Sequence, residues 1–242
     1  MDNKPQRKYN RVLLKLSGEA LMGELDFGLS VDVLTKTATE IKQLASLGVE
    51  IAIVIGGGNY LRGGNIAKSG MNRVVADKMG MLATVMNSLA LQDSLNQQNV
   101  ATLTMSSIEL PGISHKFNHE EAIKAMHSAK KVCIFAGGTG NPFFTTDTAA
   151  CLRGIEIDAD VVIKATKVDG VYDKDPVKFK DAKKYDSLSY DDVLEQKLEV
   201  MDLIAIHLCQ QHKMPLRVIN MTASGSLLAM MQSDAIGTSI RE

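Results

Sequence analysis

The order of the apolar segments constrains the fold of this chain more than any other feature. Short, almost entirely apolar segments such as 49–55 and 132–135 alternate with longer segments whose apolar residues recur every three to four positions. The first pattern predicts strands buried on both faces, and the second predicts amphipathic helices. Strands separated by helices pair in parallel, with helices covering both faces. We therefore predict an α/β fold, an open αβα sandwich with a mainly parallel central sheet.

The predicted elements follow one another without a linker, an internal repeat or a low-complexity segment. The predicted strands are 12–16, 49–55, 100–105, 132–135, 160–165 and 216–219. The predicted helices are 32–47, 71–95, 118–130, one starting at 145–147, one opening at 189, 201–212 and a short one after 225. Asn118 and Glu121 have the spacing of a capping box. We expect a single domain over residues 1–242, with residues 1–10 flexible.

Charge and cysteine usage exclude several classes of protein. The chain has 27 basic and 28 acidic residues, so no basic surface for nucleic acid or membrane is predicted. Three widely spaced cysteines indicate buried, reduced thiols, and five histidines show no metal-ligand spacing. The polar N-terminal segment does not resemble a secretion signal, and no stretch approaches the apolar length of a membrane span. We expect a cytoplasmic protein without a membrane or nucleic-acid partner.

Residues 136–147, AGGTGNPFFTTD, have the pattern of a phosphate-binding loop that lacks a lysine. A predicted strand runs into three glycines and then into Thr145, Thr146 and Asp147 at a predicted helix start. Glycines let the backbone approach an anion, and the helix N-terminus adds partial positive charge. Phe143 and Phe144 suit a flat base, although core packing explains the two rings equally well on their own. For the loop as a whole, phosphate binding is the better explanation.

Two familiar nucleotide motifs are excluded. Residues 18–23 have the glycine spacing of a P-loop, but Glu24 and Leu25 stand where lysine and a hydroxyl residue are required. Residues 56–61 begin with three glycines but lack the last glycine of the dinucleotide fingerprint. Any nucleotide must therefore be bound by a different architecture.

Three further segments follow predicted strands, at the sheet edge where open α/β folds bind ligands. Lys15, in an apolar strand end, indicates a bound anion unless it reaches solvent. Gly56–Gly58 precede Arg62, which either binds phosphate oxygens with its guanidinium or is a surface arginine. Segment 164–176 supplies lysines and carboxylates, or is an exposed hairpin-like loop. Cations and glycine loops without a histidine or thiol nucleophile suit phosphoryl transfer.

Five segments carry a resemblance to a known family: LLKLSGEAL, IAIVIGGGNYLRG, MNRVVADKMGMLATVMNSLAL, GGTGNPFFTTDTAA and KATKVDGVYDKDP. They resemble the bacterial uridylate (UMP) kinases of the amino-acid kinase superfamily, from Arg11 nearly to the C-terminus. The segment GTGNPFFTTD is specific to that family. The resemblance implies phosphoryl transfer from ATP to UMP in pyrimidine nucleotide (CTP) synthesis, on the amino-acid kinase fold. It also implies Mg²⁺ accompanying ATP and a homohexamer.

The resemblance also implies site residues, which stand here as expectations. The implied catalytic residues are Lys15, Arg62, Asp147 and Lys164. The implied ATP-binding residues are Lys15, Leu16, Ser17, Gly18, Gly58, Arg62, Thr166, Tyr172 and Asp175. The implied UMP-binding residues are Gly57, Asp77, Thr139, Gly140, Asn141, Pro142, Phe143, Phe144, Thr145 and Thr146. No protein ligand of a metal is implied.

Regulation is a further expectation from the resemblance, because the family is typically activated by GTP and inhibited by UTP. The segment near the effector region is Gly23, Glu24, Leu25, Asp26, Phe27 and Gly28. The basic residues that some members place on the intersubunit helix appear as Gln92 and Asn96 here, and Leu103 follows on the next predicted strand. Since GTP is a polyanion, this loss of cations predicts reduced or absent GTP activation.

Two alternatives stay open at this point. A related kinase acting on a carboxylate or carbamate, such as an acetylglutamate kinase, has no use for a ribose-binding Asp77. A nucleotide-binding protein without catalysis would be expected to lack at least one of the four implied catalytic residues, yet all are present. For Asp77 alone, a solvated helix face is an equally good explanation.

Overall fold

The computed structural model describes residues 7–61 and 70–242, and its centre is a single large sheet. Within those residues the sheet has nine strands in the order β4-β3-β5-β2-β1-β6-β10-β11-β9. They are β1 (Arg11–Leu16), β2 (Glu50–Ile55), β3 (Thr102–Ser106), β4 (His115–Lys116), β5 (Val132–Ala136), β6 (Val161–Thr166), β9 (Ser187–Leu188), β10 (Leu216–Asn220) and β11 (Thr238–Ile240). All neighbouring strands run parallel except β10 and β11, which confirms the predicted mainly parallel sheet.

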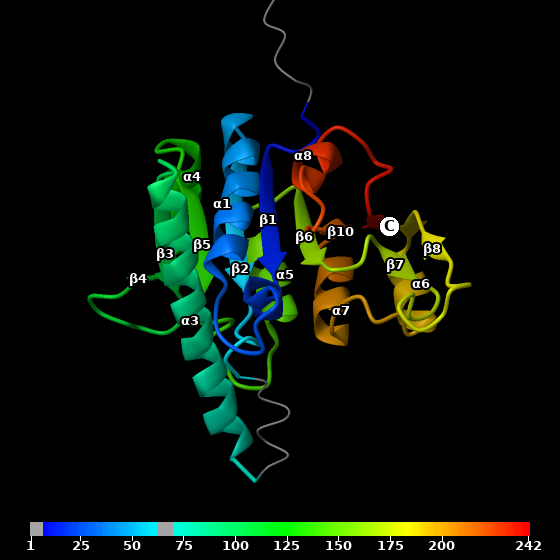
Figure 1. Ribbon diagram of the computed structural model, residues 1–242, viewed down its shortest axis with the longest axis horizontal. Coiled ribbons are helices and arrows are strands. Elements are labelled where there is room, and N and C mark those ends of the chain that lie inside the picture. Colours follow the sequence, from blue (N-terminus) through cyan, green and yellow to red (C-terminus); the bar gives the residue numbers. More distant parts are fainter. Residues whose placement is uncertain (1–6, 62–69) are drawn as a thin grey trace, which may run out of the picture.

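Helices cover both faces of this sheet (Figure 1), so the αβα sandwich is confirmed. One face carries α1 (Val31–Ser46), α3 (Arg73–Gln97) and α8 (Ser226–Met230). The other carries α4 (His119–His127), α5 (Thr146–Glu156), α6 (Tyr190–Glu195) and α7 (Leu203–Gln211). A 3₁₀ helix, η1 (Gly18–Met22), follows β1, and β7 (Val171–Tyr172) and β8 (Lys184–Tyr185) form a separate antiparallel pair.

Alternation along the central strands decides which face each side chain joins. In β1, Leu14 packs on the α1 face and Leu13 on the α5 face, so Lys15 also points to the α5 face. In β6, Lys164 shares the α5 face with Val162. The parallel register sets Lys15 directly opposite Lys164. The fold therefore brings two cations together at the carboxyl ends of adjacent strands.

Helix α3 corrects one expectation from the sequence. By length and composition alone it is apolar enough to cross a membrane, and it is the one such helix among the described residues. Within the protein, 44% of its most apolar window is buried, and the helix packs against α1, β3 and β5. Through these contacts Leu91 and Leu95 of α3 join the core on the α1 face of the sheet. Cys133, Cys151 and Cys209 are buried free thiols, as predicted.

Gly154 marks a very close contact between α5 and the sheet. A Cβ at this position would lie 2.5 Å from Cγ2 of Val162. Alanine favours a helix by about 1 kcal/mol over glycine, but overpacking costs roughly 1–3 kcal/mol. We expect Gly154→Ala to lower the free energy of unfolding in urea by about 1 kcal/mol.

A matched control for Gly154→Ala is Gly80→Ala in α3, where a Cβ would have no neighbour within 4 Å. That substitution should leave the free energy of unfolding unchanged or raise it by about 1 kcal/mol. If Gly154→Ala stabilises the protein as much as the control does, the close packing of α5 on β6 is wrong.

Candidate active site

Two lysines and one aspartate meet at the carboxyl ends of β1 and β6. Lys15 Nζ lies 2.7 Å from Asp147 Oδ1, and Lys164 Nζ lies 3.0 Å from Asp147 Oδ2. Lys164 also donates a hydrogen bond to the carbonyl oxygen of Val200. Lys15 is only 7% exposed, and a buried charge is costly unless it is paired. With one carboxylate between two ammonium groups, these three side chains carry a net charge of +1, which suits an anion.

The lysines control the ionisation of Asp147, which sits in the first turn of α5. Burial alone raises the pKa of this carboxyl, but the charges and hydrogen bonds of Lys15 and Lys164 outweigh burial and hold the pKa below its usual value. Burial lowers the pKa of Lys164, while the charge of Asp147 opposes that shift. Asp147 is therefore an anion at neutral pH, and it helps to keep Lys164 protonated.

The loop between β5 and α5 has the backbone that its glycines predicted. Gly137, Gly138 and Gly140 have φ of 77°, 58° and 84°, in the left-handed region that glycine adopts most easily. The amide of Gly137 donates to Thr84 Oγ1 at 2.8 Å. Ser107 Oγ donates to the carbonyl oxygen of Gly138 at 2.7 Å. The loop is thus fixed from both α3 and the end of β3.

Asp77 anchors the far end of the same loop. Its carboxylate accepts hydrogen bonds from Arg73 Nε at 2.8 and 2.9 Å and from the amide of Phe143 at 2.8 Å. The side chain is 13% exposed, so the alternative of a solvated helix position is wrong. Phe143 itself has φ of 71°, which is unusual for a residue with a side chain. Asp77 therefore stabilises a strained turn as well as facing the site.

A cavity of about 260 Å³ lies between this loop, α3 and the glycines after β2. It brings together seven of the ten residues expected to bind UMP: Gly57, Asp77, Thr139, Asn141, Phe144, Thr145 and Thr146. Gly140, Pro142 and Phe143 do not line it, and the ring of Phe143 points outward with 63% exposure. Gly58, expected at the ATP site, lines this cavity instead. Thr145 caps α5, accepting from the amides of Asp147 and Thr148.

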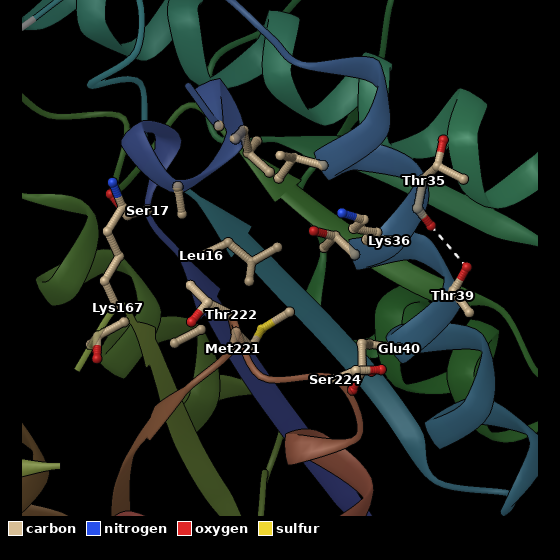
Figure 2. Close-up of a pocket in the computed structure, with 17 residues that line it drawn as sticks. Leu16, Ser17, Thr35, Lys36, Thr39, Glu40, Lys167, Met221, Thr222 and Ser224 are labelled. Carbon is tan, nitrogen blue, oxygen red and sulfur yellow. Dashed lines mark hydrogen bonds between the residues drawn. The ribbon is translucent and has the colours of Figure 1, made fainter. Parts of the chain in front are cut away.

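A second cavity of about 560 Å³ opens beside the end of β1 (Figure 2). Its walls are the end of β1, η1, α1, the end of β6 and the segment after β10. Three residues expected to bind ATP line it: Leu16, Ser17 and Thr166. Gly18 is buried just behind this wall. The charged cluster adjoins residues of both cavities in the chain: Lys15 precedes Leu16 of the larger cavity, and Asp147 follows Thr146 of the smaller one.

Two residues expected around the ATP adenosine are outside the lining of the larger cavity. Among the described residues, Tyr172 and Asp175 do not line the larger cavity. The hydroxyl of Tyr172 donates to Asp169 Oδ1 at 2.6 Å, and Asp175 Oδ1 accepts from the amide of Val177 at 2.9 Å. Both side chains are thus used locally, around the β7–β8 hairpin. Arg62, expected to contact phosphate, lies outside the described residues.

Comparison with known proteins identifies the family. The amino acid kinase family matches residues 10–220. The uridylate kinase of Pseudomonas syringae pv. syringae (strain B728a) is 56% identical over 237 residues, 98% of this chain and 96% of that protein. The chain belongs to the uridylate kinase group of the amino acid kinase family. Another relative in this group, the uridylate kinase of Actinobacillus pleuropneumoniae serotype 5b (strain L20), is 57% identical over 232 residues, 96% of this chain and 98% of that protein.

A solved structure supports the same family at the level of the fold. The UMP kinase from Bacillus anthracis superimposes with a TM-score of 0.93 at 37% identity, and 97% of each chain is covered. The family resemblance found in the five sequence segments is therefore confirmed, and with it the amino-acid kinase fold.

Several residues that line the smaller cavity were not predicted from the sequence. The missed residues are Leu61, Arg73, Ala76, Gly80, Met81 and Thr84. Arg73 carried a usable signal, because it precedes Asp77 by four residues on a predicted helix, the spacing of an ion pair. Thr84 carried none, since its partner Gly137 is 53 residues away. Segment 23–28 is a loop after η1 in which Leu25 and Phe27 are exposed, and its expected effector role stays a prediction.

Proposed function

We propose that this chain transfers the γ-phosphoryl group of ATP to UMP and releases ADP and UDP. The observation that carries the proposal is the cluster of Lys15, Asp147 and Lys164, whose neighbours in the chain line two separate cavities. Phosphoryl transfer needs positioning and charge neutralisation more than covalent chemistry. A buried cluster with net positive charge supplies the second requirement, and the two cavities supply the first.

The smaller cavity is the proposed UMP site. Thr145 and Thr146 lie at the N-terminus of α5, where the helix dipole favours a phosphate group. Asp77 offers carboxylate oxygens to the ribose hydroxyls, and Phe144 offers a ring face to the base. Of the remaining residues expected at UMP, Gly140, Pro142 and Phe143 shape the loop.

The larger cavity is the proposed site of the ATP adenosine. Its volume lies within the range of about 300–1,000 Å³ typical of small-molecule sites. Leu16 and Met221 (Figure 2), together with Leu21 and Ala165, give it apolar walls for a purine ring. Ser17 lies at the cluster end of the cavity, where the triphosphate is proposed to pass. Arg62, Tyr172 and Asp175 remain proposed ATP contacts.

The reaction needs no general base from the protein, because an oxygen of the UMP phosphate is already an anionic nucleophile. Lys15 and Lys164 donate hydrogen bonds to the phosphate oxygens as charge moves from the γ- to the β-phosphate. Asp147 holds both ammonium groups in place and keeps them charged. Mg²⁺, when bound to ATP, neutralises further phosphate charge. We propose that Mg²⁺ enters bound to ATP.

The test is an ADP-release assay with MgATP and a panel of acceptors. UMP should give the highest rate, CMP a lower one, and acetylglutamate none. A rate with acetylglutamate above that with UMP would favour the carboxylate kinase instead. No UDP from any panel member would favour a nucleotide-binding protein without catalysis.

The Asp77→Asn variant should bind UMP more weakly and ATP normally. The side-chain amide of the variant can still accept a hydrogen bond from the backbone amide of Phe143. It lacks the negative charge that the Asp77 carboxylate presents to Arg73 and to the ribose. Hydrogen bonds to charged groups contribute about 1.5–3 kcal/mol, so the KM for UMP should rise by roughly 10- to 100-fold. Steady-state kinetics with each substrate varied will measure this. An unchanged KM for UMP, or an equal rise in both KM values, would remove Asp77 from the UMP site.

We further propose a cytoplasmic homohexamer that serves pyrimidine nucleotide synthesis, with GTP and UTP as effectors. Buried reduced thiols fit the compartment. Residues 23–28 stay the proposed effector segment. Gln92 and Asn96 hydrogen-bond with Thr104 and Thr102 of β3, and neither side chain offers the positive charge that would attract GTP. Titration of GTP against initial rate tests the proposed weak activation, which several-fold activation at micromolar GTP would refute.

A further inference from the structure

Two buried asparagines form a closed hydrogen-bonded pair directly beneath the phosphate loops. Asn59 Nδ2 donates to Asn87 Oδ1 at 2.9 Å, and Asn87 Nδ2 donates to Asn59 Oδ1 at 2.7 Å. Asn59 is 2% exposed, and Asn87 in α3 is 0% exposed. Neither side chain lines either cavity, so a role in binding substrate directly does not explain the pair.

The remaining donors of the pair reach the backbone of two different loops. Asn87 Nδ2 also donates to the carbonyl oxygen of Gly56 at 2.7 Å, and Asn59 Nδ2 to the carbonyl oxygen of Gly28 at 3.0 Å. The amide of Gly28 in turn donates to the carbonyl oxygen of Asn59 at 3.1 Å. All four N–H groups of the two side-chain amides are therefore used. The pair joins α3 to both the glycine loop after β2 and segment 23–28.

The Ser17–Gly18 turn, which borders the proposed ATP site, packs against the Gly56 carbonyl and the Asn59 side chain. A Cβ on Gly18 would lie 2.5 Å from the carbonyl oxygen of Gly56 and 2.6 Å from Asn59 Oδ1. The amide of Gly56 also donates to the carbonyl oxygen of Leu16 at 2.9 Å. The positions of Gly18, Gly56 and the amide pair are thus interdependent. A shift of either asparagine moves the loops that border both cavities.

We propose that Asn59 and Asn87 are positioning residues for phosphoryl transfer: together they fix the glycine loop after β2 against the Ser17–Gly18 turn. Only a side-chain amide gives both a donor and an acceptor in this geometry. Aspartate lacks the donors and adds charge, and leucine leaves the Gly56 and Gly28 carbonyls without these partners. This inference rests on the proposed function, because the loops it positions are those proposed to hold ATP and UMP.

The test compares Asn87→Leu, Asn87→Asp and Asn59→Leu with a matched control in the same helix. The control is Ser88→Ala, since Ser88 is fully buried but its hydroxyl, within the described residues, bonds only to the Thr84 carbonyl of its own helix, at 2.8 Å. Far-UV circular dichroism and thermal unfolding give the folded fraction of each variant at the assay temperature. Initial rates with each substrate varied give kcat and both KM values per folded enzyme.

We expect the Asn87 and Asn59 variants to lose about 10- to 100-fold in kcat while folded, because misplacement by about 1 Å costs that much in a positioned reaction. The KM for UMP should rise as well. Ser88→Ala should keep kcat within about twofold of wild type. The double variant Asn59→Leu/Asn87→Leu should be no more than about threefold slower than the worse single variant, because the pair acts as one unit.

Other outcomes would overturn the inference. A purely structural role predicts a lower unfolding temperature with kcat per folded enzyme and both KM values unchanged. If Asn87→Leu does not fold, Asn87→Asp, which preserves the shape of the side chain, takes its place. Its kcat per folded enzyme and both of its KM values are then compared with those of the wild type. A wild-type enzyme that makes no UDP contradicts the proposed function. A wild-type enzyme that makes UDP, with Asn87 variants equal to Ser88→Ala, contradicts only the positioning role.

Discussion

Replacing Lys15 with alanine is expected to lower kcat by roughly 100- to 1,000-fold, the effect of removing one preorganised charge contact from a transition state. Lys15 Nζ is fixed 2.7 Å from Asp147 Oδ1, and its side chain is only 9% exposed. Because the ammonium group is already desolvated and oriented, it can meet the moving phosphate charge without reorganisation. Water entering the space left by alanine carries no such charge.

Initial rates at saturating ATP and UMP will measure this effect, with Lys42→Ala as the control. Lys42 is an exposed lysine of α1, and its removal changes the net charge equally. The control should keep kcat within about twofold of wild type. The KM for ATP should change less than kcat in Lys15→Ala, since the contact strengthens in the transition state. A kcat of Lys15→Ala close to that of the control would reject the assignment of the charged cluster.

The Asp147→Asn variant should lose about 100-fold or more in kcat, although its side chain is nearly the same size. Lys15 and Lys164 face each other across adjacent strands, and the amide no longer separates them with a negative charge. One ammonium group must then move or lose its proton.

The pH dependence of Asp147→Asn follows from the charges around Lys164. In the wild type, burial lowers the pKa of Lys164 and the charge of Asp147 opposes that shift. Without the carboxylate the pKa of Lys164 falls further. As the pH rises, Lys164 of the variant therefore loses its proton before Lys164 of the wild type does. The ratio of variant to wild-type kcat should therefore decrease from neutral to alkaline pH. A ratio that is constant with pH would mean that Asp147 does not control the charge of Lys164.

Coupling between the two positions can be measured with the double variant Lys15→Ala/Asp147→Asn. If the cluster acts as a unit, the double variant should be about as slow as the worse single variant, because each single change already disrupts it. If instead the fold-losses in kcat of the two single variants multiply in the double variant, Lys15 and Asp147 contribute independently. Thermal unfolding of all three variants serves to separate loss of activity from loss of folded protein.

The sheet was largely predictable because its central strands are apolar on both faces. Segments 12–16, 49–55, 132–135 and 160–165 each correspond to a strand with its end shifted by one residue at most. Strands of two or three residues, such as β4 and β11, have no such pattern and were not predicted. Helix α3 begins two residues later than predicted, because Asn72 caps it by accepting from the amide of Val74.

The site was predictable only where its residues share a local motif. Thr145 and Asp147 belong to one loop–helix junction, and the family resemblance supplied their roles. The register that sets Lys15 opposite Lys164 joins residues 149 positions apart, which no local pattern encodes. The same holds for the Asn59–Asn87 pair. Tyr172 and Asp175 come from the resemblance alone: both side chains make local hydrogen bonds, and their role at ATP stays a prediction.

In the proposed reaction the γ-phosphoryl group of ATP ends on UMP. Incubation with ATP radiolabelled in the γ-phosphate, Mg²⁺ and UMP, followed by separation of the nucleotides, tests this claim directly. We expect labelled UDP in equal amount to ADP, with label transfer nearly absent in Asp147→Asn. Release of ADP with the label in inorganic phosphate, or no labelled UDP at all, would contradict it.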